Sequence, residues 1–286
     1  MTQFADLHIH THFSDGSDRV DEVLAHAREN HVAFLSITDH NTVRAYSEDG
    51  LRQADEAGVR LIPGVELDVI HENRQYHLLA YGVDVHSQAL REVCAHNTRV
   101  QEESNLSLLR CMERDGLRVS EKDYHSYAIP QGRGGWKLLN YLLDTGLTGS
   151  LLEGTKYYKQ YAFDSNKIEF VSLTEAVHMV KEASGVPVLA HPAEQIPYNP
   201  YEAEHGAFWQ TLDGLLAAGI AGIECFHPLH GFGLQRELVS LCRERGLFCS
   251  GGTDYHGSFF NKQKQVVGGQ MIPASLVQGL LSRCGL

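Results

Sequence analysis

Short apolar runs alternate with amphipathic stretches along most of the chain. Residues 33–37 (AFLSI) and 186–190 (VPVLA) are apolar and short enough to form buried strands. Residues 20–31 and 173–182 instead repeat their apolar positions every three or four residues, which predicts helices that each turn one face toward a core. An alternation of strand and helix is typical of an α/β domain with a largely parallel sheet.

The same pattern places the other elements. After an opening strand that carries His8 and His10, the remaining strands are predicted at residues 33–37, 60–70, 75–83, 186–190, 221–226 and 247–250. The helices are predicted at residues 20–31, 42–57, 89–115, 136–143, 173–182, 208–218, 234–245 and 274–282.

The alternation stops between about residues 87 and 166. This stretch reads as helix, polar loop and helix, and it contains the turn-rich sequence IPQGRGG at residues 129–135. We therefore expect a main domain formed by residues 1–86 and 167–286, interrupted by a helical insertion or lid at 87–166. A pair of solvated helices with no part in the site is the alternative interpretation.

Charge and composition narrow the class of protein. The formal net charge is −12, which argues against a partner such as long nucleic acid because such binders normally carry a basic surface. The six cysteines form no C-x-x-C pair, there is no leader pattern, and no apolar run approaches the roughly 18 residues of a membrane span. We expect a cytoplasmic protein with reduced thiols and no membrane partner; the composition leaves the oligomeric state open.

The unusual number in the composition is 17 histidines, because histidine is a frequent metal ligand and acid–base group. Side chains that bind metals follow nearly every predicted strand. In an α/β barrel the carboxyl ends of the strands meet at one mouth, so side chains far apart in the sequence become neighbours. Two histidines on one strand could be merely solvated, but the whole series favours a metal site: His8, His10, Asp39, His40, Glu66, His77, His191, Asp254 and His256.

The chemistry of this set indicates which ions it would bind. Imidazole and carboxylate without thiolate suit Mn, Fe or Zn in a reactive site rather than a structural zinc site. About nine ligands exceed the four to six that one ion takes, so we expect two or three divalent metal ions, with Glu66 as a bridging carboxylate. Clustered metals activate water and hold the oxygens of a phosphoryl group during its displacement.

The order and strand-end placement of these motifs resemble those of the PHP (polymerase and histidinol phosphatase) family, over essentially the whole chain. The motifs are His8-x-His10, Ser14-Asp15-Gly16, Thr38-Asp39-His40, Gly64-Val65-Glu66, His77, Leu189-Ala190-His191-Pro192 and Gly252-Thr253-Asp254-x-His256. The resemblance implies a distorted seven-stranded (β/α) barrel with a trinuclear metal site that hydrolyses phosphate esters. It is closest to the stand-alone phosphatases of nucleotides and nucleotide bisphosphates that carry a helical insertion.

By position, the resemblance implies three sets of ligands and a metal-bridging hydroxide as nucleophile. The first ion would be held by His8, His10, Glu66 and Asp254; the second by Glu66, His77 and His191; the third by Asp15, His40 and His256. Asp39 is expected either to orient a ligand as an outer carboxylate or to cap the following turn.

The substrate side rests on fewer residues. Similar proteins have an Arg-Pro-His-type element in the insertion; this chain keeps Arg133 but has glycines at the next two positions. Arg133 is a candidate to bind phosphate bidentately, and Lys137 is a weaker candidate, since both could simply be solvated. His227 and His230 follow a predicted strand and are candidates to contact the phosphoryl group or to protonate the leaving oxygen.

The expected function is therefore the metal-dependent hydrolysis of a small phosphorylated metabolite: a nucleotide, a nucleotide bisphosphate or a sugar phosphate. The alternatives are a histidinol-phosphate phosphatase, a phosphodiesterase or exonuclease acting on cyclic phosphates or short oligonucleotides, and a metal-dependent amidohydrolase. An inactive PHP-fold binding module would be expected to have lost ligands, whereas all nine positions are filled here.

Overall fold

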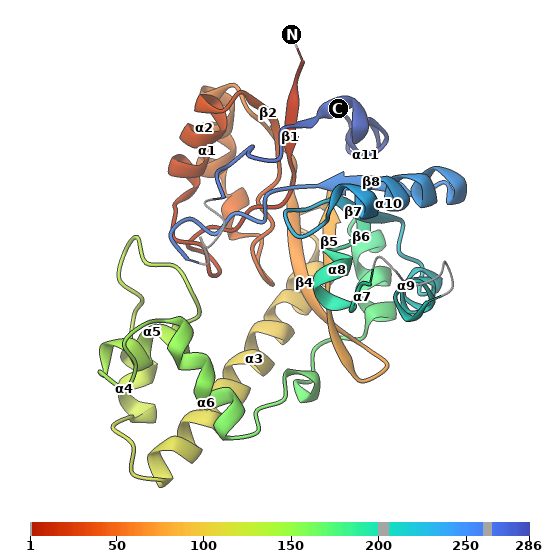
Figure 1. Ribbon diagram of the computed structural model, residues 1–286. Helices are drawn as coiled ribbons and strands as arrows, with labels where there is room; N and C mark the ends of the chain where they lie inside the picture. Colours follow the sequence, from red (N-terminus) through yellow and green to blue (C-terminus); the bar gives the residue numbers. More distant parts are fainter. Residues whose placement is uncertain (1, 200–205, 260–264) are drawn as a thin grey trace.

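A computed structural model describes residues 2–199, 206–259 and 265–286. The α/β class predicted from the sequence is confirmed: the described strands form two sheets, with helices packed against both, and the segment 87–166 extends away as a separate lobe (Figure 1). Within these residues, no helix has the length and apolar character needed to cross a membrane.

The first sheet has the strand order β3-β2-β1-β9. Strand β1 (Phe4–Asp6) pairs in parallel with β2 (Val32–Leu35) and antiparallel with β9 (Ile272–Pro273), and β3 (Arg60–Leu61) extends the sheet beyond β2. Helices α1 (Val20–Glu29) and α2 (Glu48–Ala57) cover it through buried side chains of both helices and the strands. This sheet therefore joins the two ends of the chain.

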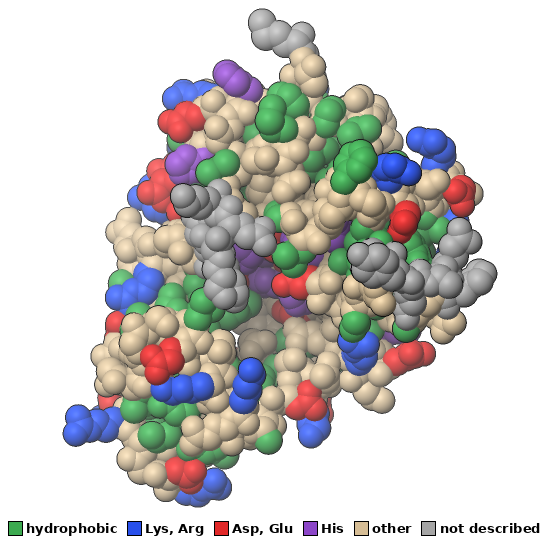
Figure 2. Space-filling view, viewed as in Figure 1, with side chains coloured by type: hydrophobic (Ala, Val, Ile, Leu, Met, Phe, Trp, Pro, Cys, Tyr) green, Lys and Arg blue, Asp and Glu red, His purple; other side chains and the backbone are tan. Residues whose placement is uncertain are grey.

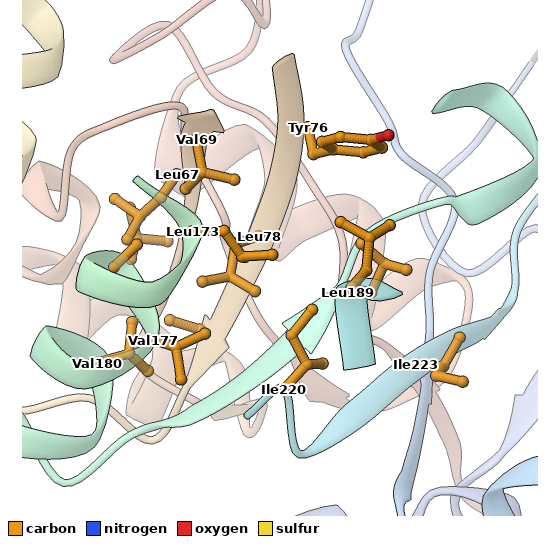
Figure 3. Packing of buried hydrophobic residues seen from close by; sticks show 14 of the residues in the cluster. Leu67, Val69, Tyr76, Leu78, Leu173, Val177, Val180, Leu189, Ile220 and Ile223 are labelled. Carbon is orange, nitrogen blue, oxygen red and sulfur yellow. The ribbon is translucent and has the colours of Figure 1, made fainter. Parts of the chain in front are cut away.

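The second sheet has the order β4-β5-β6-β7-β8. Its strands are β4 (Gly64–His71), β5 (Arg74–Tyr81), β6 (Val186–Leu189), β7 (Gly222–Phe226) and β8 (Phe248–Gly251). Strands β4, β5 and β6 pair antiparallel, while β6, β7 and β8 are parallel. The largest core cluster lies between this sheet and the helices α7 (Leu173–Glu182), α9 (Ala207–Ala217) and α10 (Phe232–Arg245) (Figure 3).

The expected single seven-stranded barrel is not what the strand pairing gives. The described strands number nine and form two open sheets, neither of which closes on itself. The sheets meet through isolated bridges, Ile9 with Tyr255 and His40 with Glu66, and buried side chains of both sheets share one core cluster. Backbone hydrogen bonds continue past the strands, from the His10 amide to the Tyr255 carbonyl at 2.8 Å and from the Glu66 amide to the Asp39 carbonyl at 3.3 Å, but they do not form a regular ladder.

The segment 87–166, all of which the structure describes, contains helices and no strand. Helix α3 (Gln88–Arg114) runs from the main body into the lobe, where it packs with α4 (Glu121–Ser126), α5 (Lys137–Asp144) and α6 (Thr155–Gln160) (Figure 1). The lobe has its own apolar cluster, which includes Leu109, Met112, Tyr124 and Leu138. A separate cluster agrees with an insertion, while its role as a lid remains a prediction.

Three predicted elements are each divided in the structure, and one of them is the predicted helix 274–282, which forms two short helices. The predicted helix 42–57 begins only at Glu48, because the Ser47 side chain accepts a hydrogen bond from the Gly50 amide at 3.2 Å and caps α2. The predicted strand 60–70 splits near Pro63 into β3 and β4, one in each sheet. The remaining short helices are Arg44–Tyr46, Leu152–Gly154, Ser165–Lys167, α8 (Pro192–Gln195), Ala274–Leu276 and α11 (Gln278–Arg283).

Gly252, just after β8, has no room for a side chain. A Cβ atom there would lie 2.3 Å from the backbone nitrogen of His8 and 2.5 Å from its Cβ. We expect Gly252→Ala to destabilise the fold by about 1–3 kcal/mol through overpacking and to displace the segment that carries His8. Denaturant unfolding would measure this loss. Gly214→Ala in α9, where a Cβ meets nothing within 4 Å, is the matched control, and equal stability of the two variants would contradict the expectation.

Candidate metal centre

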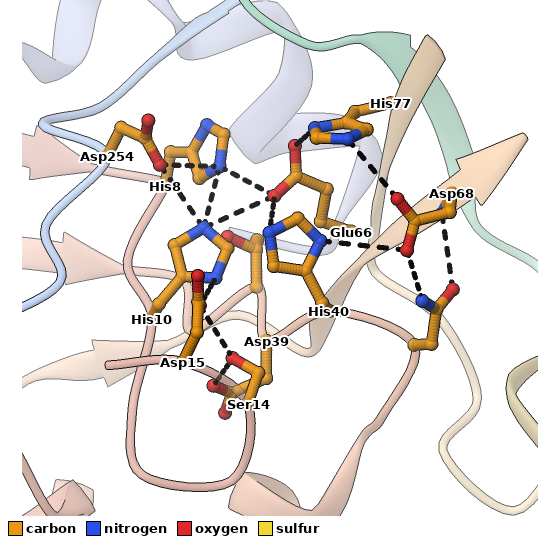
Figure 4. A network of polar contacts seen from close by, with 12 residues as sticks. His8, His10, Ser14, Asp15, Asp39, His40, Glu66, Asp68, His77 and Asp254 are labelled. Atoms are coloured by element: carbon orange, nitrogen blue, oxygen red, sulfur yellow. Dashed lines mark hydrogen bonds and ion pairs between the residues drawn. The ribbon is translucent and has the colours of Figure 1, made fainter. Parts of the chain in front are cut away.

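The nine side chains predicted as ligands gather at one end of the two sheets. His8, His10 and Asp15 come from the loop after β1, and His40 follows β2. Glu66 and His77 lie on β4 and β5, while His191, Asp254 and His256 follow β6 and β8. Figure 2 shows histidine and carboxylate side chains in a hollow between the main body and the insertion. Figure 4 shows members of the set that point toward one another: His8, His10, Asp15, His40, Glu66, His77 and Asp254.

Glu66 stands at the centre of the group, with both carboxylate oxygens in use. Its Oε2 lies 3.2 Å from Nε2 of His8, 3.2 Å from Nε2 of His10 and 3.5 Å from Nε2 of His40. Its Oε1 lies 3.1 Å from Nδ1 of His77 and 3.0 Å from Nε2 of His191. One buried carboxylate therefore faces five imidazoles, as a bridging ligand would.

The spacing of the donor atoms suits a bound cation. The Nε2 atoms of His8 and His10 are 3.1 Å apart, and Oδ1 of Asp254 lies 3.3 Å and 3.2 Å from them. Ligand atoms about 2.1 Å from one ion would be roughly 3.0–3.4 Å apart in octahedral or tetrahedral coordination. The observed spacing therefore fits a divalent ion bound between these atoms.

A second group lies beside the first. Asp15 contacts His256 (Oδ2 to Nε2, 3.3 Å) and His10 (Oδ1 to Nδ1, 3.6 Å), and these residues together with His40 could hold another ion. The buried Nδ1 atoms of His10, His40 and His77 have no hydrogen-bond partner. Buried polar atoms without partners are costly, and coordination would satisfy Nδ1 of His77, which faces Oε1 of Glu66.

The electrostatics of the site favour positive charge at its centre. Burial alone would lower the pKa of His10, but Asp254, Glu66 and Asp15 raise this pKa to about 10. Burial alone would raise the pKa of Glu66, yet the surrounding histidines hold it well below its usual value. The pKa of Asp254 is likewise held well below its usual value, against its burial, by His8 and His256. Bound divalent ions could supply this positive charge in place of protons.

The structure supports a metal centre, but it does not assign each ligand to one particular ion. The groups of donor atoms close enough to share an ion are His10–Asp15–His40–His256, His8–His10–Glu66, His40–Glu66–His77 and His191–Glu194–Asp254. The first agrees with the predicted third set, apart from the addition of His10. The number and identity of the ions remain predictions.

Two buried carboxylates of the site were missed by the sequence analysis. Glu224 on β7 accepts hydrogen bonds from Nδ1 of His8 at 2.9 Å and from the amide of His191 at 2.7 Å. Asp68 on β4 lies 3.2 Å from Nε2 of His77. Both have a sequence signal: Glu224 is a charged residue within the apolar run of a predicted strand, and Asp68 is two residues from Glu66, on the same face.

Asp39 turns away from the cluster and into the opening loop. Its carboxylate accepts hydrogen bonds from the amide and hydroxyl of Thr11, both at 2.7 Å, and from the hydroxyl of Ser14 at 2.6 Å. It therefore fixes the loop between His10 and Asp15, which agrees with the orienting alternative. Its catalytic role remains a prediction.

The structure places the two candidate acid histidines differently. His227 lines the pocket, with Nε2 at 3.4 Å from Oδ2 of Asp254, and its Nδ1 accepts a hydrogen bond from the Leu229 amide at 3.3 Å. His230 is buried beneath it: its Nδ1 contacts the Cys225 carbonyl at 3.1 Å, and its Nε2 accepts from the Ala193 amide at 3.4 Å. Burial lowers the pKa of His230 to about 4. His227 is thus the better placed of the two.

Arg133 and Lys137 do not line the metal pocket. The Arg133 guanidinium is paired with Asp144, with Nη1 to Oδ1 at 2.7 Å, and it borders a neighbouring cavity with His12. The Lys137 ammonium lies 3.7 Å from Glu102 and over the Tyr124 ring. Their roles in phosphate binding remain predictions, and each would need its side chain to leave a present partner.

The pocket over the cluster has a volume of about 310 Å³. Seven of the candidate metal ligands line it, together with Glu194, His227, Leu229, Gln265 and Trp136. Among the described residues, Trp136 is the one contribution of the insertion. The Trp136 ring lies 5.2 Å from that of His40. No lysine or arginine of the described part of the chain lines the pocket, so attraction of an anion would depend on bound cations.

Comparison with known proteins agrees with this site. Residues 6–195 match the PHP domain, and the chain belongs to the PHP domain family. The resemblance inferred from the motifs is thereby confirmed, together with the assignment of the chain as a metal-dependent phosphoesterase.

Three relatives and one solved structure illustrate the range of the family. The chain is 30% identical over 267 residues to the phosphoribosyl 1,2-cyclic phosphate 1,2-diphosphodiesterase of Eggerthella lenta. The aligned region covers 89% of this chain and 94% of the relative. It is 24% identical to the 3′,5′-nucleoside bisphosphate phosphatase of Chromobacterium violaceum (88% and 86% covered) and 24% identical to the 5′-3′ exoribonuclease Rnm of Escherichia coli (88% and 84%). A structure from Bifidobacterium adolescentis, provisionally named a metal-dependent phosphoesterase, superposes with a TM-score of 0.77 at 21% identity (98% and 96% covered) and shows the same fold.

Proposed function

We propose that this chain hydrolyses a phosphate ester of a small phosphorylated metabolite, a nucleotide, nucleotide bisphosphate or sugar phosphate, with two or three divalent ions of Mn, Fe or Zn. The observation that carries the proposal is the convergence of nine imidazole and carboxylate side chains, with Glu66 at their centre, seven of which line one pocket of about 310 Å³. A pocket of this size suits a small molecule better than a long nucleic acid. The relative from Eggerthella lenta favours, as a second candidate, a cyclic phosphodiester of a phosphorylated sugar.

Bound divalent ions supply the activation of water and the neutralisation of phosphoryl oxygens. His8, His10, Glu66 and Asp254 would hold one ion. A second ion would be held by Glu66 together with His77 and His191. Asp15, His40 and His256 would hold a third. The backbone amide bonded to Nδ1 of His227 leaves the proton of the neutral ring on Nε2, 3.4 Å from Oδ2 of Asp254. His227 lines the pocket and would therefore contact a phosphoryl oxygen as a hydrogen-bond donor.

A substrate panel tests the proposal. The metal-loaded chain would be incubated with nucleotides, nucleoside bisphosphates, histidinol phosphate, sugar phosphates and cyclic sugar phosphates. Phosphorus NMR would follow both free phosphate and the opening of cyclic diesters. We expect hydrolysis of at least one small ester and none of long RNA. Inactivity toward every small ester would overturn the proposal.

Trp136 offers a flat apolar surface for the organic part of the substrate. Stacking on an aromatic side chain contributes about 1–3 kcal/mol for a base, so we expect Trp136→Ala to raise KM for a nucleotide about 5- to 100-fold, with a much smaller change in kcat. Methyl phosphate, which has nothing to stack, should be affected little. Trp209→Ala on α9, away from the pocket, is the matched control. If Trp136→Ala had the same KM for the nucleotide as wild type, Trp136 would not be part of the binding site.

A further inference from the structure

Asp68 lies behind two of the histidines that face Glu66. Its Oδ1 is 3.2 Å from Nε2 of His77, and its Oδ2 is 4.0 Å from Nδ1 of His40 (Figure 4). The opposite nitrogens of the two rings face Glu66, Nδ1 of His77 at 3.1 Å and Nε2 of His40 at 3.5 Å. Each ring therefore lies between Asp68 on one side and the centre of the site on the other.

The arrangement indicates which nitrogen of His77 would bind a metal. Nδ1 faces Glu66 at 3.1 Å, on the side of the other ligands, so an ion held there would take the Nδ1 lone pair. The proton of the ring would then lie on Nε2, where Asp68 accepts it at 3.2 Å. At His40 the contact of 4.0 Å is electrostatic and favours the same choice, with the proton on Nδ1 and the lone pair on Nε2.

Asp68 is itself held by a buried network. Asn41, immediately after His40, donates from its side-chain nitrogen to Oδ2 of Asp68, and its carbonyl oxygen accepts from the Asp68 amide at 3.2 Å. Gln75 donates to Oδ1 of Asp68 at 2.7 Å. Both carboxylate oxygens thus have fixed donors as well as a histidine.

The network reaches the insertion through Asn97, a fully buried residue of α3. Its side-chain nitrogen donates to Oδ1 of Asn41 at 2.8 Å and to the Asp68 carbonyl at 2.7 Å. Its side-chain oxygen accepts from the Val171 amide at 3.1 Å. The helix that begins the insertion is therefore fixed to the residues beside His40 and to the strand that carries Glu66.

We propose that Asp68 is a positioning residue that sets the tautomer and orientation of His77 and His40, and that Asn97 connects the insertion to these ligands. The inference rests on the proposed function, because it treats both histidines as metal ligands. It implies that a change in the position of α3 alters metal affinity without any contact between the insertion and the ions.

Asp68→Asn tests the first part in the full chain. Outer carboxylates of this kind affect metal affinity by 10–100-fold, so we expect Mn²⁺ to bind about 10–100-fold more weakly by calorimetry. NMR of ¹⁵N-histidine with Zn²⁺ bound should show the resonance of the Nε2 proton of His77 shifted upfield, because a neutral acceptor replaces a charged one. Asp68→Glu should restore part of the affinity, and Asp84→Asn, at an exposed turn, is the control.

The outcomes separate the inference from the function. If wild type binds Mn²⁺ and Asp68→Asn leaves both the affinity and the histidine spectrum unchanged, the positioning role is wrong and the proposed function stands. If wild type binds no divalent ion, the proposed function fails as well. Should Asp68→Asn not fold, Asp68→Glu and the wild-type histidine spectrum still decide, since protonation of His77 mainly on Nδ1 would contradict the inference.

Asn97→Ala tests the connection to the insertion. Coupling through such networks is worth about 0.5–2 kcal/mol, which corresponds to a loss of Mn²⁺ affinity of roughly 2- to 30-fold. Asn105→Ala is the matched control, because Asn105 is buried on the same helix but outside this network. The control should lower thermal stability and leave metal affinity unchanged. Equal metal affinity in Asn97→Ala and wild type would overturn the connection.

Discussion

Glu66→Gln is expected to abolish hydrolysis while preserving the shape of the side chain. Five histidines lie within 3.0–3.5 Å of the Glu66 oxygens, so the amide removes a charge they all share and turns an NH₂ group toward nitrogens that must keep their lone pairs. Metal ions supply several kcal/mol of transition-state stabilisation, which predicts a fall in kcat/KM of about 10³-fold or more. Steady-state kinetics and elemental analysis of the purified variant would measure both losses.

The control for this variant is Glu72→Gln, an exposed position in the turn of the same hairpin. It should retain the activity and the metal content of wild type. A Glu66→Gln variant that retained its full complement of metal would show that the carboxylate does not bridge ions. Retained activity would exclude Glu66 from the mechanism altogether.

Removal of metal is expected to abolish activity and to lower thermal stability together. An ion present at 100 times its dissociation constant stabilises the folded state by about 2.7 kcal/mol, so chelation should lower Tm by roughly 5–10 °C for a chain of this size. Addition of Mn²⁺, Fe²⁺ or Zn²⁺ should restore both, and the ion that restores most activity identifies the preferred metal. Activity that persists in chelator with no bound metal would exclude the metal-dependent mechanism.

The candidate ligands could be predicted because two independent sequence signals coincide. His191 and Asp254 follow short apolar runs that form β6 and β8, and their residue types are those that bind metals. Glu224 and Asp68 were missed although each had a signal. The prediction was based on residues at strand ends, and these two carboxylates lie within strands. A buried charge in an apolar strand needs a partner, and that requirement alone marks Glu224 as part of a site.

Other features depend on contacts that local patterns do not contain. The pairing of Arg133 with Asp144 is decided by how the loop before α5 folds back on that helix, so the sequence could not show that the guanidinium lies outside the pocket. Strand β9 was missed because Ile272 and Pro273 form only two residues of strand, paired with β1 from the far end of the chain. The division into two open sheets likewise depends on pairings between segments far apart in the sequence.

Strand β1 is held by residues that follow it by more than 240 positions. Asp6 accepts hydrogen bonds from the amide of Thr253 at 2.9 Å and from that of Gly268 at 2.7 Å, and β9 pairs beside it. Non-local contacts of this kind require closure of a long loop, which slows their formation. A chain still on the ribosome would carry His8 and His10 without Asp254 or His256. A metal site that needs all four side chains could therefore be completed only after synthesis.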